Sequence, residues 1–139
     1  MLPGKKSGFE LDVRLERASI PVMWLGLCEL RLINDRRWPW LLLVPQRNDI
    51  EEMHDLTPLD QAMLTFELSM VSKALKQVTD CDTVNISVAC NAVRQLHIDV
   101  VARSRSDPAW PGPIWDGEPH QPYMRQSLAP FLEKLRAAL

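Results

Sequence analysis

Apolar and polar residues alternate with a period of two along several short stretches of the chain, the pattern of a β-strand with one covered face. Residues 84–89 and residues 96–103 both alternate in this way, and we predict a strand over each of them. Only residues 90–94 separate these two strands. Because a parallel pair needs a much longer crossover, the two strands are predicted to be antiparallel neighbours.

Two further strands are predicted nearer the start of the chain. Residues 22–33 are rich in apolar residues and alternate at their end, and residues 41–44 form an apolar run that Pro45 closes. Such a run is typical of a central strand with both faces covered. The polar residues 34–37 supply a turn, so the two segments are predicted to form a hairpin. Residues 9–20 fit either a strand or a short helix, and the pattern leaves both open.

The clearest helix is predicted over residues 58–78. Thr57 is a favourable N-cap, Pro58 suits the first helical position, and Asp60 would complete a Thr-x-x-Asp capping box. Apolar residues then recur every three or four positions, and we expect this stripe to pack on the sheet. The stripe consists of Leu59, Met63, Phe66, Met70, Ala74 and Val78, widened by Ala62, Val71 and Leu75.

A second helix is predicted near the end of the chain, from about Ser127. Pro130 then falls in the first turn of this helix, where a proline is tolerated. One face of the helix carries Leu128, Leu132 and Leu135. The order of strands, long helix, strands, loop and final helix predicts an α+β fold with an antiparallel sheet of about five strands.

Composition narrows the class of protein. Of the 139 residues, 46% are hydrophobic, which suits a single domain with one core. Within this domain we expect residues 1–8 to be a loose end and residues 116–139 to be a C-terminal extension that carries the final helix. The net charge of -2 gives no general attraction to nucleic acid or to an anionic membrane. Three cysteines without a CxxC pair do not form a disulfide framework. No run approaches the roughly 18 apolar residues that span a bilayer, so we expect a cytoplasmic protein.

The strand predicted over residues 96–103 has one polar face. If its apolar residues face the long helix, its polar residues and the residue before the strand project side by side from the opposite face. These residues are Gln95, His97 and Asp99. Three groups that donate, accept or titrate in one row are candidates for a site, although an edge strand also shows polar residues merely to solvent.

Residues 95–101, Gln-Leu-His-Ile-Asp-Val-Val, resemble the histidine triad (HIT) motif His-φ-His-φ-His-φ-φ, in which φ is apolar. Residues 90–94, Cys-Asn-Ala-Val-Arg, resemble the Gly-Asn-Val-Val-Pro stretch of a bacterial branch of that superfamily, in which the first triad position is normally Gln. Residues 38–45 and 107–115 resemble two more segments of this branch. The four pieces follow one another in the family's order, over about residues 20–115.

The resemblance implies a HIT-like fold and a nucleotide hydrolase or nucleotidyltransferase that acts at an α-phosphate. His97, at the middle triad position, would attack phosphorus and form a nucleotidyl-histidine intermediate. The outer positions Gln95 and Asp99, together with Asn91 and Arg94, would bind or orient the phosphate. The implied substrate is a dinucleoside polyphosphate or a nucleoside phosphoramidate, with no metal or cofactor in the scheme. The resemblance also implies a two-fold homodimer in which two sheets join, and residues 22–27 are apolar enough to contribute.

The sequence departs from the family motif at three positions. Asp99 replaces the third histidine, and at ~6 Å, with an effective dielectric of ~20, its carboxylate would repel a phosphate charge by roughly 3 kcal/mol. Alternatively, Asp99 accepts a hydrogen bond from the His97 ring. Cys90 and Arg94 replace the usual Gly and Pro, and Cys90 is interpreted as an inert thiol rather than a nucleophile. The alternative function is therefore a catalytically degenerate HIT-fold protein, which binds nucleotide weakly or acts as a dimeric interaction module; a third is an unrelated interaction domain.

Further candidate residues have two interpretations each. The resemblance places the turn residues Asn34 and Asp35 near the ribose hydroxyls, but Asn and Asp are also ordinary turn residues. The tryptophans at positions 38, 40, 110 and 115 would line a base pocket or anchor a core or an interface. A zinc site built from Cys81, Cys90 and His97 is not expected, because their spacing is unlike that of zinc ligands.

Overall fold

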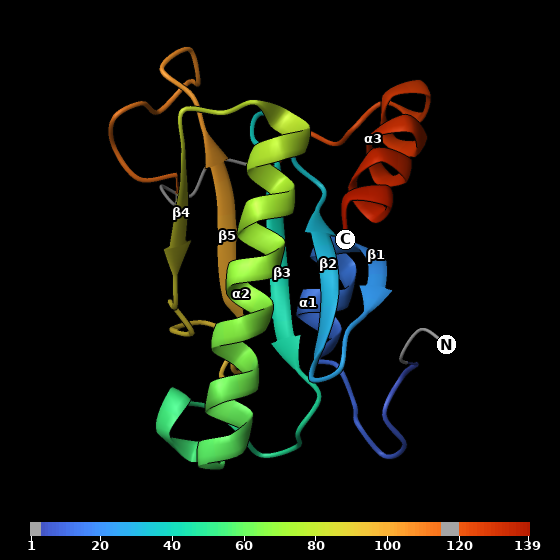
Figure 1. Cartoon of the computed structure of the whole chain (residues 1–139), viewed down its shortest axis with the longest axis vertical. Coiled ribbons are helices and arrows are strands. Elements are labelled where there is room, and N and C mark those ends of the chain that lie inside the picture. Colours follow the sequence, from blue (N-terminus) through green and yellow to red (C-terminus); the bar gives the residue numbers. More distant parts are fainter. Residues whose placement is uncertain (1–3, 115–119) are drawn as a thin grey trace.

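The computed structural model describes residues 4–114 and 120–139, and its strands form one antiparallel sheet of five (Figure 1). The strands stand in the order β1-β2-β3-β5-β4 and are β1 (Ser19–Trp24), β2 (Cys28–Ile33), β3 (Trp40–Pro45), β4 (Thr83–Ser87) and β5 (Ile98–Arg103). The predicted α+β class and five-stranded sheet are confirmed. Residues 1–3 of the expected loose end at residues 1–8, residues 116–119 of the expected extension, and Trp115 lie outside the described residues.

Within residues 4–114 and 120–139, three α-helices and a short 3-10 turn at Met53–Asp55 accompany the sheet. The helices are α1 (Val13–Ala18), α2 (Pro58–Thr79) and α3 (Arg125–Ala138). In Figure 1, α2 crosses one face of the sheet and α3 lies beside it near β1. None of the described helices is long and apolar enough to cross a membrane.

The sheet packs on both of its faces. Leu41 and Leu43 of β3 join the main core with residues of α2 and α3, whereas Leu42 and Val44 point to the other side. There they pack against Phe9 and Leu15 of the N-terminal segment, together with Ile33. Residues 41–44 are therefore a central strand with both faces covered, as their unbroken apolar run predicts.

The interpretation of residues 22–33 as one strand is wrong, because the chain reverses at residues 25–27. The Leu25 N–H donates to the carbonyl of Cys28 at 2.8 Å, and β1 and β2 pair in antiparallel fashion on either side of this turn. The turn contains one glycine among apolar residues, so it lacks the Asn-Gly or Asp-Gly signal that normally reveals a hairpin. Residues 9–20 contain the short helix α1, whose N-cap Asp12 accepts the Arg14 N–H at 2.8 Å.

Helix α2 begins where it was predicted, but its buried face is the predicted one only toward its C-terminal end, where Val71, Ala74 and Leu75 are buried. Thr57 Oγ1 accepts the Asp60 N–H, whereas the Asp60 carboxylate binds the Arg47 guanidinium instead of completing a capping box. Leu59 and Phe66 are 74% and 66% exposed. The helical residues that are buried are Asp60, Leu64, Glu67, Val71, Ala74 and Leu75.

The buried face of α2 is set by a hydrogen-bonded carboxylate. Glu67 is 2% exposed and accepts the N–H groups of Leu27 and Cys28 at 2.8 and 2.9 Å. Turning the helix to bury Phe66 would leave these two buried N–H groups without an acceptor. That loss costs more free energy than leaving an aromatic ring exposed.

Helix α3 begins at Arg125, two residues before the expected start, so Pro130 lies in its second turn rather than its first. Leu132 and Leu135 are buried, and Leu128 packs partly against the main core, as predicted for this face.

Candidate functional site

Strand β5 separates its apolar and polar residues between the two faces of the sheet. Ile98, Val100 and the preceding Leu96 belong to the core beneath α2. Asp99 therefore lies on the opposite face, and the structure places His97 immediately before the strand. The strand begins later than predicted, because the Leu96 N–H donates to Ile50 in a loop rather than to a neighbouring strand.

The His97 ring has one nitrogen fixed by the backbone. Nδ1 lies 2.7 Å from the carbonyl oxygen of Gln95. Because a carbonyl oxygen can only accept, Nδ1 must carry the ring hydrogen, and Nε2 then carries the lone pair. The residue is 9% exposed, so the protein packs around most of the ring. This arrangement leaves the lone pair of the neutral ring on Nε2.

Asp99 binds a tryptophan rather than the histidine. The indole N–H of Trp40 donates to Asp99 Oδ1 at 2.9 Å, and Trp40 also packs edge-on against His120. Burial raises the pKa of Asp99, while the Trp40 hydrogen bond opposes this change. The alternative in which Asp99 orients the His97 ring does not describe this structure, since Gln95 occupies Nδ1.

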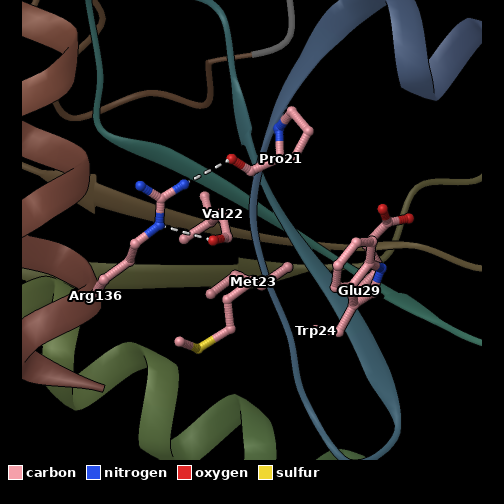
Figure 2. Close-up of a pocket in the computed structure, with 7 residues that line it drawn as sticks. Pro21, Val22, Met23, Trp24, Glu29 and Arg136 are labelled. Atoms are coloured by element: carbon pink, nitrogen blue, oxygen red, sulfur yellow. Dashed lines mark hydrogen bonds between the residues drawn. The ribbon is translucent and has the colours of Figure 1, made fainter. Parts of the chain in front are cut away.

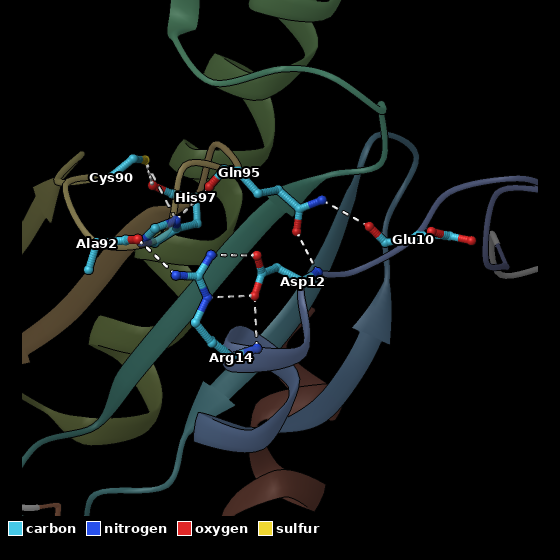
Figure 3. A network of polar contacts seen from close by, with 7 residues as sticks. All are labelled: Glu10, Asp12, Arg14, Cys90, Ala92, Gln95 and His97. Atoms are coloured by element: carbon cyan, nitrogen blue, oxygen red, sulfur yellow. Dashed lines mark hydrogen bonds and ion pairs between the residues drawn. The ribbon is translucent and has the colours of Figure 1, made fainter.

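The Gln95 side chain holds the N-terminal segment against the site (Figure 3). Its Oε1 accepts the N–H of Asp12, and its Nε2 donates to the carbonyl of Glu10, both at 2.9 Å. The first position of the motif therefore links the triad to a segment more than 80 residues earlier in the chain.

Arg14 approaches the same loop and was not singled out from the sequence. Its Nη1 donates to the Ala92 carbonyl at 3.0 Å, and its Nη2 pairs with Asp12 Oδ2 at 2.9 Å. Hydrogen bonds from Arg14 lower the pKa of Asp12, and the charge of a protonated His97 lowers it further. No local pattern around Arg14 signals this position, because the contact joins residues 78 apart.

A histidine of fixed tautomer immediately before β5, followed by a carboxylate on the polar face of that strand, resembles the arrangement that the motif implies. The sequence model of the HIT domain matches residues 15–106. The chain belongs to the histidine triad (HIT) family. A search of curated proteins finds no match.

Three solved bacterial structures are similar to this HIT protein along nearly its whole length. A histidine triad protein from Sinorhizobium meliloti 1021 is 51% identical, with a TM-score of 0.93, covering 98% of this chain and 100% of that one. One from Bradyrhizobium japonicum is 39% identical, with a TM-score of 0.91 and coverage of 94% and 97%. One from Marinobacter aquaeolei VT8 is 36% identical, with a TM-score of 0.91 and coverage of 94% and 96%.

The loop between β4 and β5 brings Cys90 to His97 in this HIT protein. Cys90 Sγ lies 3.6 Å from His97 Nδ1 and donates to the His97 carbonyl at 3.6 Å. Burial raises the pKa of the Cys90 thiol, which favours the protonated form over a nucleophilic thiolate. Cys81 is instead part of the core beneath α2.

The two loop residues expected at the phosphate are exposed. Asn91 lies at the surface of the loop. The Arg94 guanidinium, 72% exposed, turns to Glu51 Oε2 at 3.1 Å.

The turn expected at the ribose lies at the other end of the sheet and has other partners. Asn34 Oδ1 accepts the N–H of Tyr123, and the fully buried Asp35 pairs with Arg37 at 2.7 Å. The turn leads into β3, whose first residue, Trp40, lies opposite Val101 of β5. By the ordinary rise of a strand, Val101 is about 13 Å from His97 along the chain. The structure therefore does not bring the turn residues together with His97.

The described tryptophans divide between core and surface. Trp38 is buried and packs with Val101, whereas Trp40 reaches Asp99. Arg103 stacks its guanidinium on the Trp110 ring. Arg103 also binds Asp107 and the Gly112 carbonyl, and so holds the loop that follows β5.

One polar cavity adjoins the triad residues. It has a volume of about 240 Å³ and is lined by Asp12, Arg14, Asp49, Ile50, Glu51, Arg94 and Gln95. A second cavity, of about 220 Å³, lies at β1 and is lined by residues of β1 and β2 together with Arg136 (Figure 2). It shares no residue with the triad.

Proposed function

We propose that this HIT protein is a nucleotide hydrolase or nucleotidyltransferase that acts at an α-phosphate through His97. The hydrogen bond from Nδ1 to the Gln95 carbonyl carries this proposal, because it directs the ring hydrogen away from Nε2. An imidazole in this tautomer is nucleophilic at neutral pH and is also a good leaving group from phosphorus.

The reaction has two steps at phosphorus. The Nε2 lone pair forms a bond to the α-phosphorus while the bond to the leaving group breaks, and the leaving group keeps the electron pair and takes a proton from solvent. Water then attacks the nucleotidyl-histidine, the P–N bond breaks, its electron pair returns to Nε2, and the proton that the water loses passes to solvent. The Gln95 carbonyl, which accepts from Nδ1, stabilises the positive charge of the ring between the two steps.

Asp99 is compatible with a bound phosphate in its neutral form. Burial raises its pKa, so it keeps its proton to a higher pH than an exposed aspartate does. The neutral carboxyl group does not repel phosphate and can donate a hydrogen bond to it. In this scheme Gln95 is a positioning residue that fixes the N-terminal segment.

The test uses a dinucleoside tetraphosphate and adenosine phosphoramidate as substrates and measures AMP release. His97→Ala should abolish turnover, and single-turnover incubation of the wild-type protein with α-labelled nucleotide should label the protein covalently. His54→Ala is the matched control, because the His54 side chain is 83% exposed and lies in another loop. Turnover that survives in His97→Ala would refute the assignment.

A second candidate function is a HIT protein that binds nucleotide without turnover. Asp99 at the third triad position favours it, because any ionised fraction of this buried carboxylate opposes a phosphate. If the wild-type protein binds AMP in calorimetry but releases none from either substrate, Asp99→His should introduce turnover. An inactive Asp99→His variant that still binds AMP would contradict this explanation.

We further propose that the protein forms a two-fold homodimer through β4 rather than through residues 22–27. At the β1 edge, the Arg136 guanidinium donates to the carbonyls of Val22 and Pro21 at 2.9 and 3.3 Å, as Figure 2 shows. The β4 edge lies at the other end of the sheet order, and its Ile86 is 49% exposed. An exposed apolar edge strand is suited to pairing with a second copy.

Light scattering after size exclusion tests the dimer. The wild-type protein should show twice the chain mass of 15.9 kDa. Ile86→Lys should yield the monomer, while Val13→Lys, at a similarly exposed apolar residue of α1, should remain dimeric. A wild-type monomer at tens of micromolar, or a dimeric Ile86→Lys variant, would refute the interface.

A further inference from the structure

Helix α1 places a guanidinium against the loop that carries the catalytic histidine. Arg14 Nη1 donates to the Ala92 carbonyl at 3.0 Å, and Cys90, two residues earlier in the loop, contacts the His97 ring. Figure 3 shows the Arg14 head group between this loop and Asp12, on the side where the His97 ring lies. The Arg14 guanidinium therefore packs on the loop that leads to His97, and its partner Asp12 lies within electrostatic range of the His97 ring.

Three other arginines of the described residues each pair with a carboxylate. Arg94 turns out of the loop to Glu51, and Arg103 binds Asp107 at the far end of β5. Arg31 is buried on β2 with Glu29 and Ser19. Arg14 and Arg94 both line the polar cavity beside Gln95, and of the two it is Arg14 whose guanidinium bonds to the loop backbone, at Ala92, whereas Arg94 bonds to Glu51.

The position of Arg14 is held by the backbone rather than by its ion pair. Gln95 fixes the backbone on the N-terminal side of α1 through Glu10 and Asp12, and Leu15 is buried against the sheet. The Arg14 and Asp12 side chains are 58% and 23% exposed. An exposed ion pair contributes little to stability, so the guanidinium can exchange the Asp12 carboxylate for a phosphate at small cost.

We propose that Arg14 is a substrate-binding residue that contacts the oxygens of the α-phosphate during the reaction at His97. The inference rests on the proposed function and adds a ligand from outside the triad motif. A guanidinium offers two parallel N–H donors to a phosphate, which a lysine does not reproduce. In this role Arg14 supplies the charge that Asp99 does not.

The experiment compares AMP with adenosine as ligands in calorimetry, because the two differ only in the phosphate. Arg14→Met should weaken AMP binding about 10- to 100-fold, the usual effect of losing a charge-assisted hydrogen bond, and should leave adenosine binding unchanged. The AMP affinity of Arg14→Lys should lie between that of the wild type and that of Arg14→Met. Arg17→Met is the matched control, because Arg17 is an exposed arginine of the same helix.

A second variant separates a phosphate ligand from a structural ion pair. Asp12→Asn keeps a good N-cap residue but removes the competing carboxylate, so it should bind AMP as tightly as the wild type or about 2- to 5-fold more tightly. If Arg14 served only to hold the ion pair, Asp12→Asn would weaken AMP binding as much as Arg14→Met does.

The outcomes distinguish this inference from the proposed function. Wild-type protein that binds AMP, together with an Arg14→Met variant that binds AMP as tightly as Arg17→Met does, refutes the role of Arg14 alone. Wild-type protein that neither binds AMP nor turns over either substrate refutes the proposed function, and the role of Arg14 with it.

Discussion

Glu67 is the residue whose replacement we expect to destabilise the protein most clearly. Its carboxylate reaches from the middle of α2 to the turn between β1 and β2, where its two oxygens accept the N–H groups of Leu27 and Cys28. The residue is 2% exposed, and both donors are buried, so water cannot replace the lost acceptor.

The magnitude follows from counting the donors that are left without an acceptor. Glu67→Gln keeps one oxygen but places an amide N–H₂ group against the other backbone N–H, and one orphaned buried donor costs about 1–3 kcal/mol. Glu67→Ala orphans both donors and also leaves a cavity, which raises the expected loss to ~3–5 kcal/mol. Either loss is a large share of the roughly 5–15 kcal/mol that stabilises an ordinary domain.

Equilibrium unfolding in urea, followed by tryptophan fluorescence, measures the effect. With an m-value of about 1.5–2 kcal/mol per molar, a loss of ~2 kcal/mol lowers the midpoint by about 1 M. Glu133→Gln is the matched control, because Glu133 is exposed on α3 and should change stability by less than ~0.5 kcal/mol. Equal midpoints for Glu67→Gln and Glu133→Gln would refute the reasoning.

Three further predictions concern charge and burial. Burial alone would raise the pKa of Asp107, but hydrogen bonds from Arg103 and Ser104 lower it from the ordinary value of 3.8 to about 2. The contribution of Asp107 to the unfolding free energy is therefore complete above about pH 4 and is lost as the pH falls toward about 2. Asp107→Asn should therefore cost ~2 kcal/mol at pH 7 and little at pH 2 in urea titrations; an equal cost at both would contradict this. Because burial raises the pKa of Asp99, wild-type stability falls as pH rises through that pKa; Asp99→Asn should therefore raise the urea midpoint at pH 7 and leave it unchanged at pH 3. Phe66→Ser should change the unfolding free energy by less than ~0.5 kcal/mol, because Phe66 is 66% exposed; a loss of several kcal/mol would mean that it is buried.

Local patterns predicted the secondary structure wherever one segment carried its own signal. Thr57 and Pro58 located the start of α2 to the residue, and the short link at residues 90–94 predicted that β4 and β5 are antiparallel neighbours. The turn at residues 25–27 was missed, because it is stabilised by Glu67 from another element rather than by its own residues.

The residues of the candidate site on and next to β5 were predictable from the sequence, whereas those that reach it from distant parts of the chain were not. The period of two placed Asp99 on the face opposite α2, and the structure agrees, because its neighbours Ile98 and Val100 lie in the core beneath α2. Arg14 could not be found in the same way, because its contact with Ala92 joins residues 78 apart and leaves no periodic trace. The partners of Asn34 and Asp35 are likewise tertiary.

The sequence by itself determined where α2 begins, that β4 and β5 are antiparallel neighbours and which face of β5 is polar, because hydrophobic periodicity and capping act within a few residues. Only the tertiary structure decided which side of the first half of α2 is buried. Leu59 and Phe66 supply a better apolar stripe than Glu67 does, yet Glu67 lies inside. The reason is that buried N–H groups must find acceptors, and here the acceptor comes from a helix 40 residues further along the chain.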